Sequence, residues 1–262
     1  MNADSQALNP EHQRPAPGDD VVLLGVRFDH LTRAGAHAAL VSAFGRGEAW
    51  KVYIANAHTL NLAWGDPAFR QVLNEADLLL NDGSGVRLAS RMAGKPFPDN
   101  LVGTDLAPEV CAQATLRGVG VFLLGGAPGV PEQAAVRLRQ MFPALRISGL
   151  RHGHFAQSEN RGVVEEINRS GAGVILVAMG NPLQEIWIHR NASSLHGDLC
   201  IGVGGYFDHL SGRLRRAPRW MRWAGIEWVH IMMSQPHKWR RYIIGNPLFL
   251  GRAILSRLGW GP

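Results

Sequence analysis

Short apolar runs that alternate with amphipathic segments constrain the fold of this chain more than any other feature of its sequence. The runs are apolar throughout rather than at every second residue, which is typical of parallel strands covered by helices on both faces. The expected strands are residues 21–24, 52–55, 77–80, 120–124, 146–149, 174–178 and 199–203, and the expected helices between them include residues 105–116, 131–141, 160–170 and 182–193. This alternation predicts an α/β fold with a Rossmann-like parallel sheet and helices on both of its faces.

The strand pattern stops after Gly204 and Gly205, and only helical patterns follow, interrupted by Pro236 and Pro247. The first twenty residues are polar and contain several prolines, without the basic start and apolar run of a signal peptide. No apolar run reaches the roughly 18 residues that a membrane-spanning helix needs. We therefore expect a flexible leader at residues 1–20, an α/β core at 21–210 that folds without the rest, and a small helical C-terminal appendage at 211–262.

Positive charge is concentrated in the expected appendage. Residues 211–262 contain ten basic residues and one acidic residue, whereas the remaining chain carries a net charge of −3. Five of the eight tryptophans also lie in this segment. The asymmetry predicts an anionic partner, such as a membrane surface, a polyphosphate or nucleic acid. Tryptophan together with arginine favours the membrane surface, and no nucleic-acid-binding motif accompanies the charge; a solvated basic face with tryptophans in the core is the alternative.

Polar or glycine-rich loops follow five of the expected strands. Their sequences are ANAHT, NDGSG, GGAPG, MGNPLQE and GVGGYFDH. In open α/β sheets ligands bind beyond the carboxyl ends of the strands, so one site could be assembled from all five loops. Asp82 lies at a strand tip beside glycines that would let a substrate approach closely, which suits a general base. An Asx turn or a helix cap is the alternative interpretation of Asp82.

The GGAPG loop joins a strand to a helix, and the backbone N–H groups of such a turn can bind phosphate. The loop lacks the G-x-G-x-x-G pattern, which favours a nucleotide diphosphate over a dinucleotide. A tight turn without a ligand is the alternative. The chain contains no Asp-x-Asp motif, so we expect basic side chains rather than a metal ion to carry the charge of a phosphate. No cofactor is expected.

In their order along the chain, the motifs resemble those of the WecG/TagA/CpsF family, which is glycosyltransferase family 26. The resemblance extends from about residue 21 to residue 247. It implies an inverting, metal-independent peripheral membrane enzyme that transfers a sugar from a UDP-sugar to a polyprenyl-diphosphate-linked acceptor at the cytoplasmic face of the membrane. The motifs that carry it are ADLLLNDGSGV, LVGTDLAPEVC, VFLLGGAPGV, VAMGNPLQEIWI, GVGGYFDHLSGRLRRAPRWM and GIEWVHIMMSQPHKWRRY.

The resemblance also implies roles for single residues. The family's proposed base falls on Asp82, and basic residues of the appendage would meet the acceptor diphosphate or the membrane. Three positions depart from residues common in the family, which leaves the donor sugar open: Ile54, Asn100 and Ile231. The expected substrate-binding residues are Asn56, Asn81, Gly83, Thr104, Gly125, Gly126, Gln184, Gly204 and Asp208, and the expected basic residues are Arg216, Lys238 and Arg241.

Two other classes of function are compatible with parts of the sequence. A nucleotide-dependent oxidoreductase could use the turn at Gly125, but the dinucleotide fingerprint is missing. A non-catalytic membrane or nucleic-acid adaptor could use the basic appendage, but polar residues at so many strand ends argue for a catalytic site. The glycosyltransferase is therefore the preferred prediction, with a UDP-sugar, a lipid-linked acceptor and an anionic membrane surface as partners and a homo-oligomer as a possible assembly.

Overall fold

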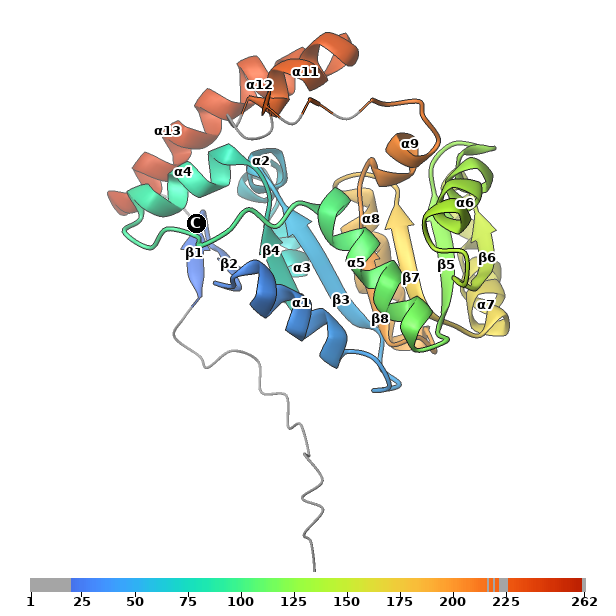
Figure 1. Cartoon of the computed structure of the whole chain (residues 1–262). Helices are drawn as coiled ribbons and strands as arrows, with labels where there is room; N and C mark the ends of the chain where they lie inside the picture. Colours follow the sequence, from blue (N-terminus) through green and yellow to red (C-terminus); the bar gives the residue numbers. More distant parts are fainter. Residues whose placement is uncertain (1–19, 216, 219, 222–225, 261–262) are drawn as a thin grey trace, which may run out of the picture.

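The computed structural model describes residues 20–215, 217–218, 220–221 and 226–260. Its centre is a six-stranded sheet in which every neighbouring pair of strands is parallel, and helices cover both faces of the sheet (Figure 1). The predicted α/β fold is therefore confirmed. In the order of the sheet the strands are β4 (Leu78–Asn81), β3 (Trp50–Ala55), β8 (Leu199–Gly202), β7 (Ala172–Ala178), β5 (Gly120–Gly125) and β6 (Ile147–Arg151).

The alternating side chains of the strands supply two hydrophobic layers, one on each face of the sheet. Tyr53 and Ala55 of β3 face one layer, and Val52 and Ile54 face the other. The first layer is completed by α2 (Ala57–Gly65), α3 (Pro67–Asn74), α4 (Ser84–Met92), α7 (Asn160–Ser170) and α8 (Leu183–Asn191). The second is completed by α1 (Arg33–Ser42), α5 (Gly103–Leu116), α6 (Val130–Met141) and α9 (Tyr206–Leu210). Two short 3-10 turns, η1 (Gln157–Glu159) and η2 (Ala192–Ser194), precede α7 and follow α8.

The prediction that residues 21–24 form a strand of the parallel sheet was wrong. Val21–Leu23 (β1) pairs instead with Val26–Phe28 (β2) in a separate antiparallel hairpin. Leu24 and Gly25 form its two-residue turn, with φ of 54° and 75°, the positive values that such hairpin turns require. Leu24 is buried, so its packing offsets the cost of a conformation that leucine rarely adopts. The sequence signal is weak because leucine stands where asparagine or aspartate is usual.

The C-terminal segment comprises α11 (Glu227–Ser234), η3 (Pro236–Lys238), α12 (Trp239–Ile243) and α13 (Gly245–Arg257). Residues 216, 219 and 222–225 of this segment lie outside the described residues, as do residues 1–19 of the expected leader. None of the helices within the described ranges is long and apolar enough to cross a bilayer.

The last helix, α13, lies against α2 and α4 (Figure 1). Phe249 of α13 is fully buried and belongs to the same hydrophobic layer as Leu60 and Val86. The side-chain amide of Asn61 donates to Gly245 O at 2.7 Å, and Arg252 donates to Asn61 Oδ1 at 2.8 Å. The boundary at residue 210 stays a prediction, but these contacts argue against a core that is complete without the C-terminal helices.

Candidate active site

A cavity of about 330 Å³ lies beyond the carboxyl ends of β3, β4, β7 and β8, within the size range of small-molecule sites. Its walls come from four strand-end loops, from residues 100–104 at the start of α5, and from the C-terminal segment. The C-terminal residues that line it are Trp228, Ile231, Gln235, Lys238, Arg241, Tyr242 and Asn246. The site therefore combines the core with the segment that the sequence analysis separated from it.

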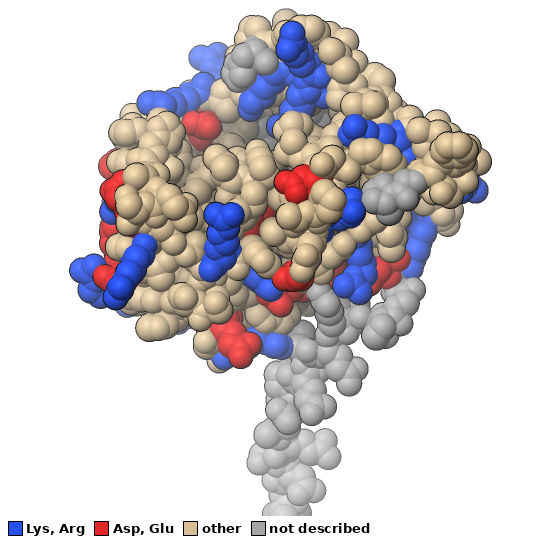
Figure 2. Space-filling model, turned by 180° about the vertical axis from the view of Figure 1, so that it is seen from behind, with Lys and Arg blue, Asp and Glu red and all other residues tan. Residues whose placement is uncertain are grey.

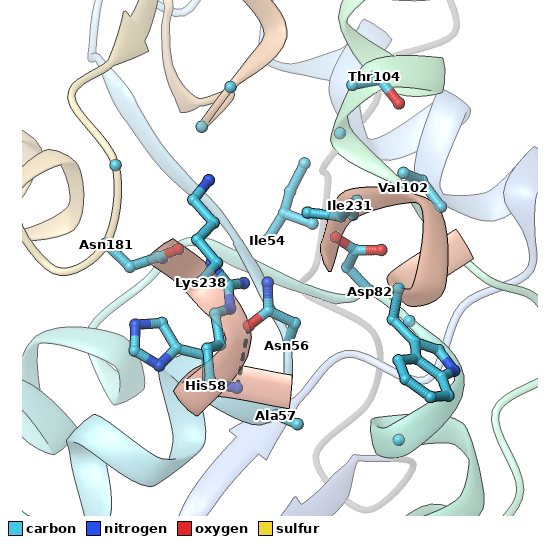
Figure 3. A pocket seen from close by; sticks show the side chains of 18 of the residues that line it. Ile54, Asn56, Ala57, His58, Asp82, Val102, Thr104, Asn181, Ile231 and Lys238 are labelled. Atoms are coloured by element: carbon cyan, nitrogen blue, oxygen red, sulfur yellow. Dashed lines mark hydrogen bonds between the residues drawn. The ribbon is translucent and has the colours of Figure 1, made fainter. Parts of the chain in front are cut away.

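Asp82 follows β4 directly, and its carboxylate points into the cavity (Figure 3). The Asp82 N–H donates to Ala55 O at 2.9 Å, which extends the pairing of β3 and β4 by one residue. Gly83 then turns the chain into α4 with a φ of 91°, a value that favours glycine. The Gly83 N–H donates to Asn100 Oδ1 at 2.8 Å. Hydrogen bonds to Ala55 on one side and to Asn100 on the other thus fix the turn that carries Asp82.

Asn56 is the N-cap residue of α2 and lines the cavity. Its Oδ1 accepts the backbone N–H groups of His58 at 3.0 Å and Thr59 at 3.3 Å, and the Thr59 hydroxyl accepts the Asn56 N–H at 3.3 Å. This capping box fixes the side chain, because the helix uses its oxygen. The Asn56 amide nitrogen is directed into the cavity (Figure 3), where it can donate to a ligand oxygen.

Lys238 and Arg241 place positive charge in the cavity, which His58 of α2 also lines. Burial, together with the charges of Arg241 and Lys238, lowers the pKa of His58 to about 4, so its imidazole is neutral at neutral pH. Burial also lowers the pKa of Lys238, as does the charge of Arg241, whereas Asp208 opposes the shift. These shifts show that the cationic groups lie close enough to repel one another. An anionic ligand in the cavity would relieve that repulsion.

Eight of the predicted site residues line this cavity, and four do not. Asp208 lies outside the lining, although its charge acts on Lys238. Arg216 lies outside the described residues. The lining residues are Asn56, Asp82, Gly83, Thr104, Gln184, Gly204, Lys238 and Arg241; the others are Asn81, Gly125, Gly126 and Asp208.

Asn81 and the glycine turn have structural roles instead. Asn81 is fully buried, and its side chain donates to Asp99 O at 2.9 Å, which holds the segment next to Asp82. Gly125 has a φ of 135°, and a Cβ there would lie 2.4 Å from Ala178 O. The Gly126 N–H donates to Ala178 O at 2.9 Å and is therefore already used. Close packing against β7 accounts for Gly125, whereas a Cβ on Gly126, whose φ is 69°, would lie 2.8 Å from Val130 Cγ1 of α6.

The cavity also contains residues to which the sequence analysis gave no role, among them His58, Asn181, Trp228 and Tyr242. His58 and Asn181 belong to motifs already singled out, so their position within those loops was the available signal. The three positions that depart from common family residues, Ile54, Asn100 and Ile231, all line the cavity. Among the described residues, no group of three or more His, Cys, Asp or Glu side chains is arranged to hold a metal ion.

The sequence is similar to that of known proteins over most of its length. A model of the glycosyl transferase WecG/TagA/CpsF family matches residues 21–261. The chain is also similar to the N-acetylglucosaminyldiphosphoundecaprenol N-acetyl-beta-D-mannosaminyltransferase of Bacillus spizizenii. The two are 32% identical over 178 residues, which is 68% of each chain.

Proposed function

The chain belongs to the WecG/TagA/CpsF family of glycosyl transferases, and we propose that it transfers a sugar from a UDP-sugar to a polyprenyl-diphosphate-linked saccharide, with inversion and without a metal ion. One observation carries the proposal: a single cavity contains the carboxylate of Asp82 and the cationic groups of Lys238 and Arg241. A base and an anion-binding group in one site are the two requirements of this reaction.

In the proposed reaction an acceptor hydroxyl attacks the anomeric carbon of the donor sugar. Asp82 accepts the hydroxyl proton as the new carbon–oxygen bond forms, and the bond from the anomeric carbon to the UDP oxygen breaks. The attack comes from the face opposite UDP, so a single displacement inverts that carbon. UDP leaves with negative charge, which Lys238 and Arg241 stabilise in place of a metal ion.

The Bacillus spizizenii relative is named for transfer of N-acetylmannosamine to a diphosphoundecaprenol-linked N-acetylglucosamine. We extend the acceptor class to this chain, which would act in the synthesis of a cell-envelope polysaccharide. The donor would be a hexose or an N-acetylhexosamine linked to UDP. Ile54, Asn100 and Ile231 line the cavity at positions where the family commonly has other residues, so we expect them to select the sugar.

The first test is ligand binding under chelation. UDP should raise the thermal unfolding temperature of the full-length protein in the presence of EDTA, because the basic side chains of the cavity replace a metal ion as the diphosphate-binding groups. Sugar transfer from the accepted UDP-sugar should also survive EDTA. NAD and NADP should produce no comparable stabilisation, and they are measured at the same concentrations as a control.

Two results would overturn this proposal. Stabilisation by NAD or NADP in preference to UDP would favour the oxidoreductase. Loss of transfer in EDTA that manganese or magnesium restores would show that a metal ion binds the diphosphate.

The outer surface of the C-terminal segment supports a peripheral position on the membrane. Trp239 and Ile243 of α12 are 43% and 53% exposed, and Trp220 and Met233 nearby in the sequence are also exposed. Figure 2 shows Lys and Arg side chains predominating at the end of the molecule where the C-terminal helices lie. Apolar and basic side chains together bind anionic lipid surfaces. We place the enzyme at the cytoplasmic face, where its lipid-linked acceptor would be reached.

Replacing both Trp239 and Ile243 by serine should weaken binding to anionic liposomes. Each substitution should cost about tenfold in affinity or more, because burying one large apolar side chain contributes ~1.5–3 kcal/mol. Co-sedimentation with phosphatidylglycerol vesicles at low and high salt measures this, and the charge-driven part should weaken with salt.

The matched control replaces Leu116 and Val136 by serine, because both are exposed apolar residues on the surface of the α/β part of the chain. Equal liposome binding by the α12 variant, the control and the wild type would show that the C-terminal segment is not the membrane-binding surface.

A further inference from the structure

Glu185 is a fully buried carboxyl group that does not line the cavity, although both residues hydrogen-bonded to it do. Asn181 donates its side-chain N–H to Glu185 Oε1 at 2.6 Å, and Gln184 donates to the same oxygen at 2.8 Å. The other oxygen, Oε2, has no hydrogen-bond partner among the described residues. Glu185 Oε1, which lies behind the cavity wall, therefore accepts hydrogen bonds from the side-chain amides of two residues that line the cavity.

These contacts fix which atoms the two amides present. Gln184 Oε1 accepts the Gly204 N–H at 3.0 Å, and because a backbone N–H can only donate, the amide nitrogen must face Glu185. Gly202 leaves room for this nitrogen, since a Cβ there would lie 2.8 Å from it. Asn181 likewise turns its nitrogen to Glu185, and its oxygen points into the cavity (Figure 3).

Asn181 therefore offers an acceptor to the cavity, and the group that it fits is a donor such as a sugar hydroxyl. Each amide nitrogen carries two hydrogens and gives one to Glu185. The hydrogen bonds also connect two loops of the site, because Asn181 follows β7 and Gly204 follows β8. Without an acceptor at the position of Glu185, nothing in this network would keep the amide of Asn181 from rotating by 180°.

Burying Glu185 is costly for stability. Burial raises its pKa to about 7, and a buried carboxyl with one unpartnered oxygen is generally less favourable than an apolar side chain of similar volume. The stability of the fold therefore does not account for the carboxyl group, whereas the orientation of two cavity residues does.

We propose that Glu185 is a positioning residue, which holds the side-chain amides of Asn181 and Gln184 in the orientation that binds the UDP-sugar. The inference rests on the proposed function, and it assigns to the loop after β7 the recognition of a ribose hydroxyl of UDP.

Glu185→Leu and Glu185→Gln separate orientation from stability. Leucine removes the acceptor, and UDP affinity should fall about 5- to 30-fold, as expected for one or two misdirected hydrogen bonds. Its thermal unfolding temperature should stay close to that of the wild type, because removing a buried carboxyl offsets the lost hydrogen bonds. Glutamine keeps an oxygen at the same position, so Glu185→Gln should bind UDP almost as the wild type does.

Isothermal titration with UDP and thermal unfolding of the full-length protein measure both quantities. With the UDP-sugar that supports transfer, Glu185→Leu should raise the KM for the donor more than it lowers kcat. Ile188→Val is the matched control, because Ile188 is a fully buried residue of the same helix that does not line the cavity. It should lower the unfolding temperature and leave UDP affinity unchanged.

Three results would overturn the inference: unchanged UDP affinity in Glu185→Leu, a loss of affinity that only parallels a loss of stability, or equal weakening in Glu185→Gln. Failure of the wild-type protein to bind UDP is a different outcome, because it would remove the proposed donor class itself.

Discussion

Asp82→Asn should lower turnover by about 10²–10⁴-fold, the usual effect of removing one general base. Asparagine has nearly the same shape but cannot accept the proton of the attacking hydroxyl at neutral pH. UDP affinity and the thermal unfolding temperature should stay near their wild-type values, because the backbone N–H of residue 82 still pairs with Ala55 O. Single-turnover transfer to a lipid-linked acceptor and titration with UDP separate the chemical step from binding.

The strand that carries Asp82 also supplies the control. Asp77 precedes β4 at its opposite end, where its carboxylate accepts the Lys51 N–H at 2.8 Å. Asp77→Asn keeps an oxygen for this bond and should retain turnover. Near-normal turnover in Asp82→Asn would exclude Asp82 as the base, and equal losses in the two variants would point to damage of the strand rather than of the chemistry.

Phe249→Ala should destabilise the protein by about 3–5 kcal/mol, the range for removing a buried aromatic side chain. Phe249 of α13 is fully buried, and it packs toward α2 and α4, the two helices that begin at the cavity. A Cβ on Gly85 of α4 would lie only 3.9 Å from its ring, which shows how closely the two helices approach. Chemical denaturation of the full-length protein measures the loss.

Leu248 is the matched control for this substitution, because it is the preceding residue of the same helix and is 46% exposed. Leu248→Ala should change stability by less than about 0.5 kcal/mol, as is usual at the surface. Equal effects of the two substitutions would show that α13 is an attachment and not part of the hydrophobic core. The same reasoning predicts that a chain cut after residue 210 loses stability, because it loses Phe249.

The parallel sheet could be predicted from the sequence because strands buried on both faces leave a local signature of consecutive apolar residues. The hairpin at Leu24 could not, since its turn depends on the burial of a leucine in an unfavourable conformation. The position of Asp82 at the cavity was predictable for a similar local reason, because ligands bind beyond the carboxyl ends of parallel strands. Its neighbour Asn81 was assigned the wrong environment: it is the last residue of β4 and is fully buried beneath the loop that it supports.

The glycine turn at Gly125 was ambiguous in the sequence, because phosphate binding and close packing both require glycine. Only the distance to Ala178 O distinguishes them here. Lys238 and Arg241 line the same cavity as Asp82, although they follow it by more than 150 residues in the sequence. No local pattern encodes such a contact, and the resemblance to the family was what indicated it.

In the proposed membrane-bound state, the five residues of α12 would link binding of a ligand in the cavity to adsorption on the lipid surface. Arg241 lines the cavity, while Trp239 and Ile243, on the same short helix, are exposed to the surroundings. A lipid surface that restrained α12 would also restrain Arg241, and adsorption would then be coupled to ligand binding. Linkage is reciprocal: the factor by which the membrane tightens binding of a nucleotide equals the factor by which that nucleotide tightens adsorption to the membrane. The proposed enzyme would then be recruited to its acceptor most strongly when its donor is already bound.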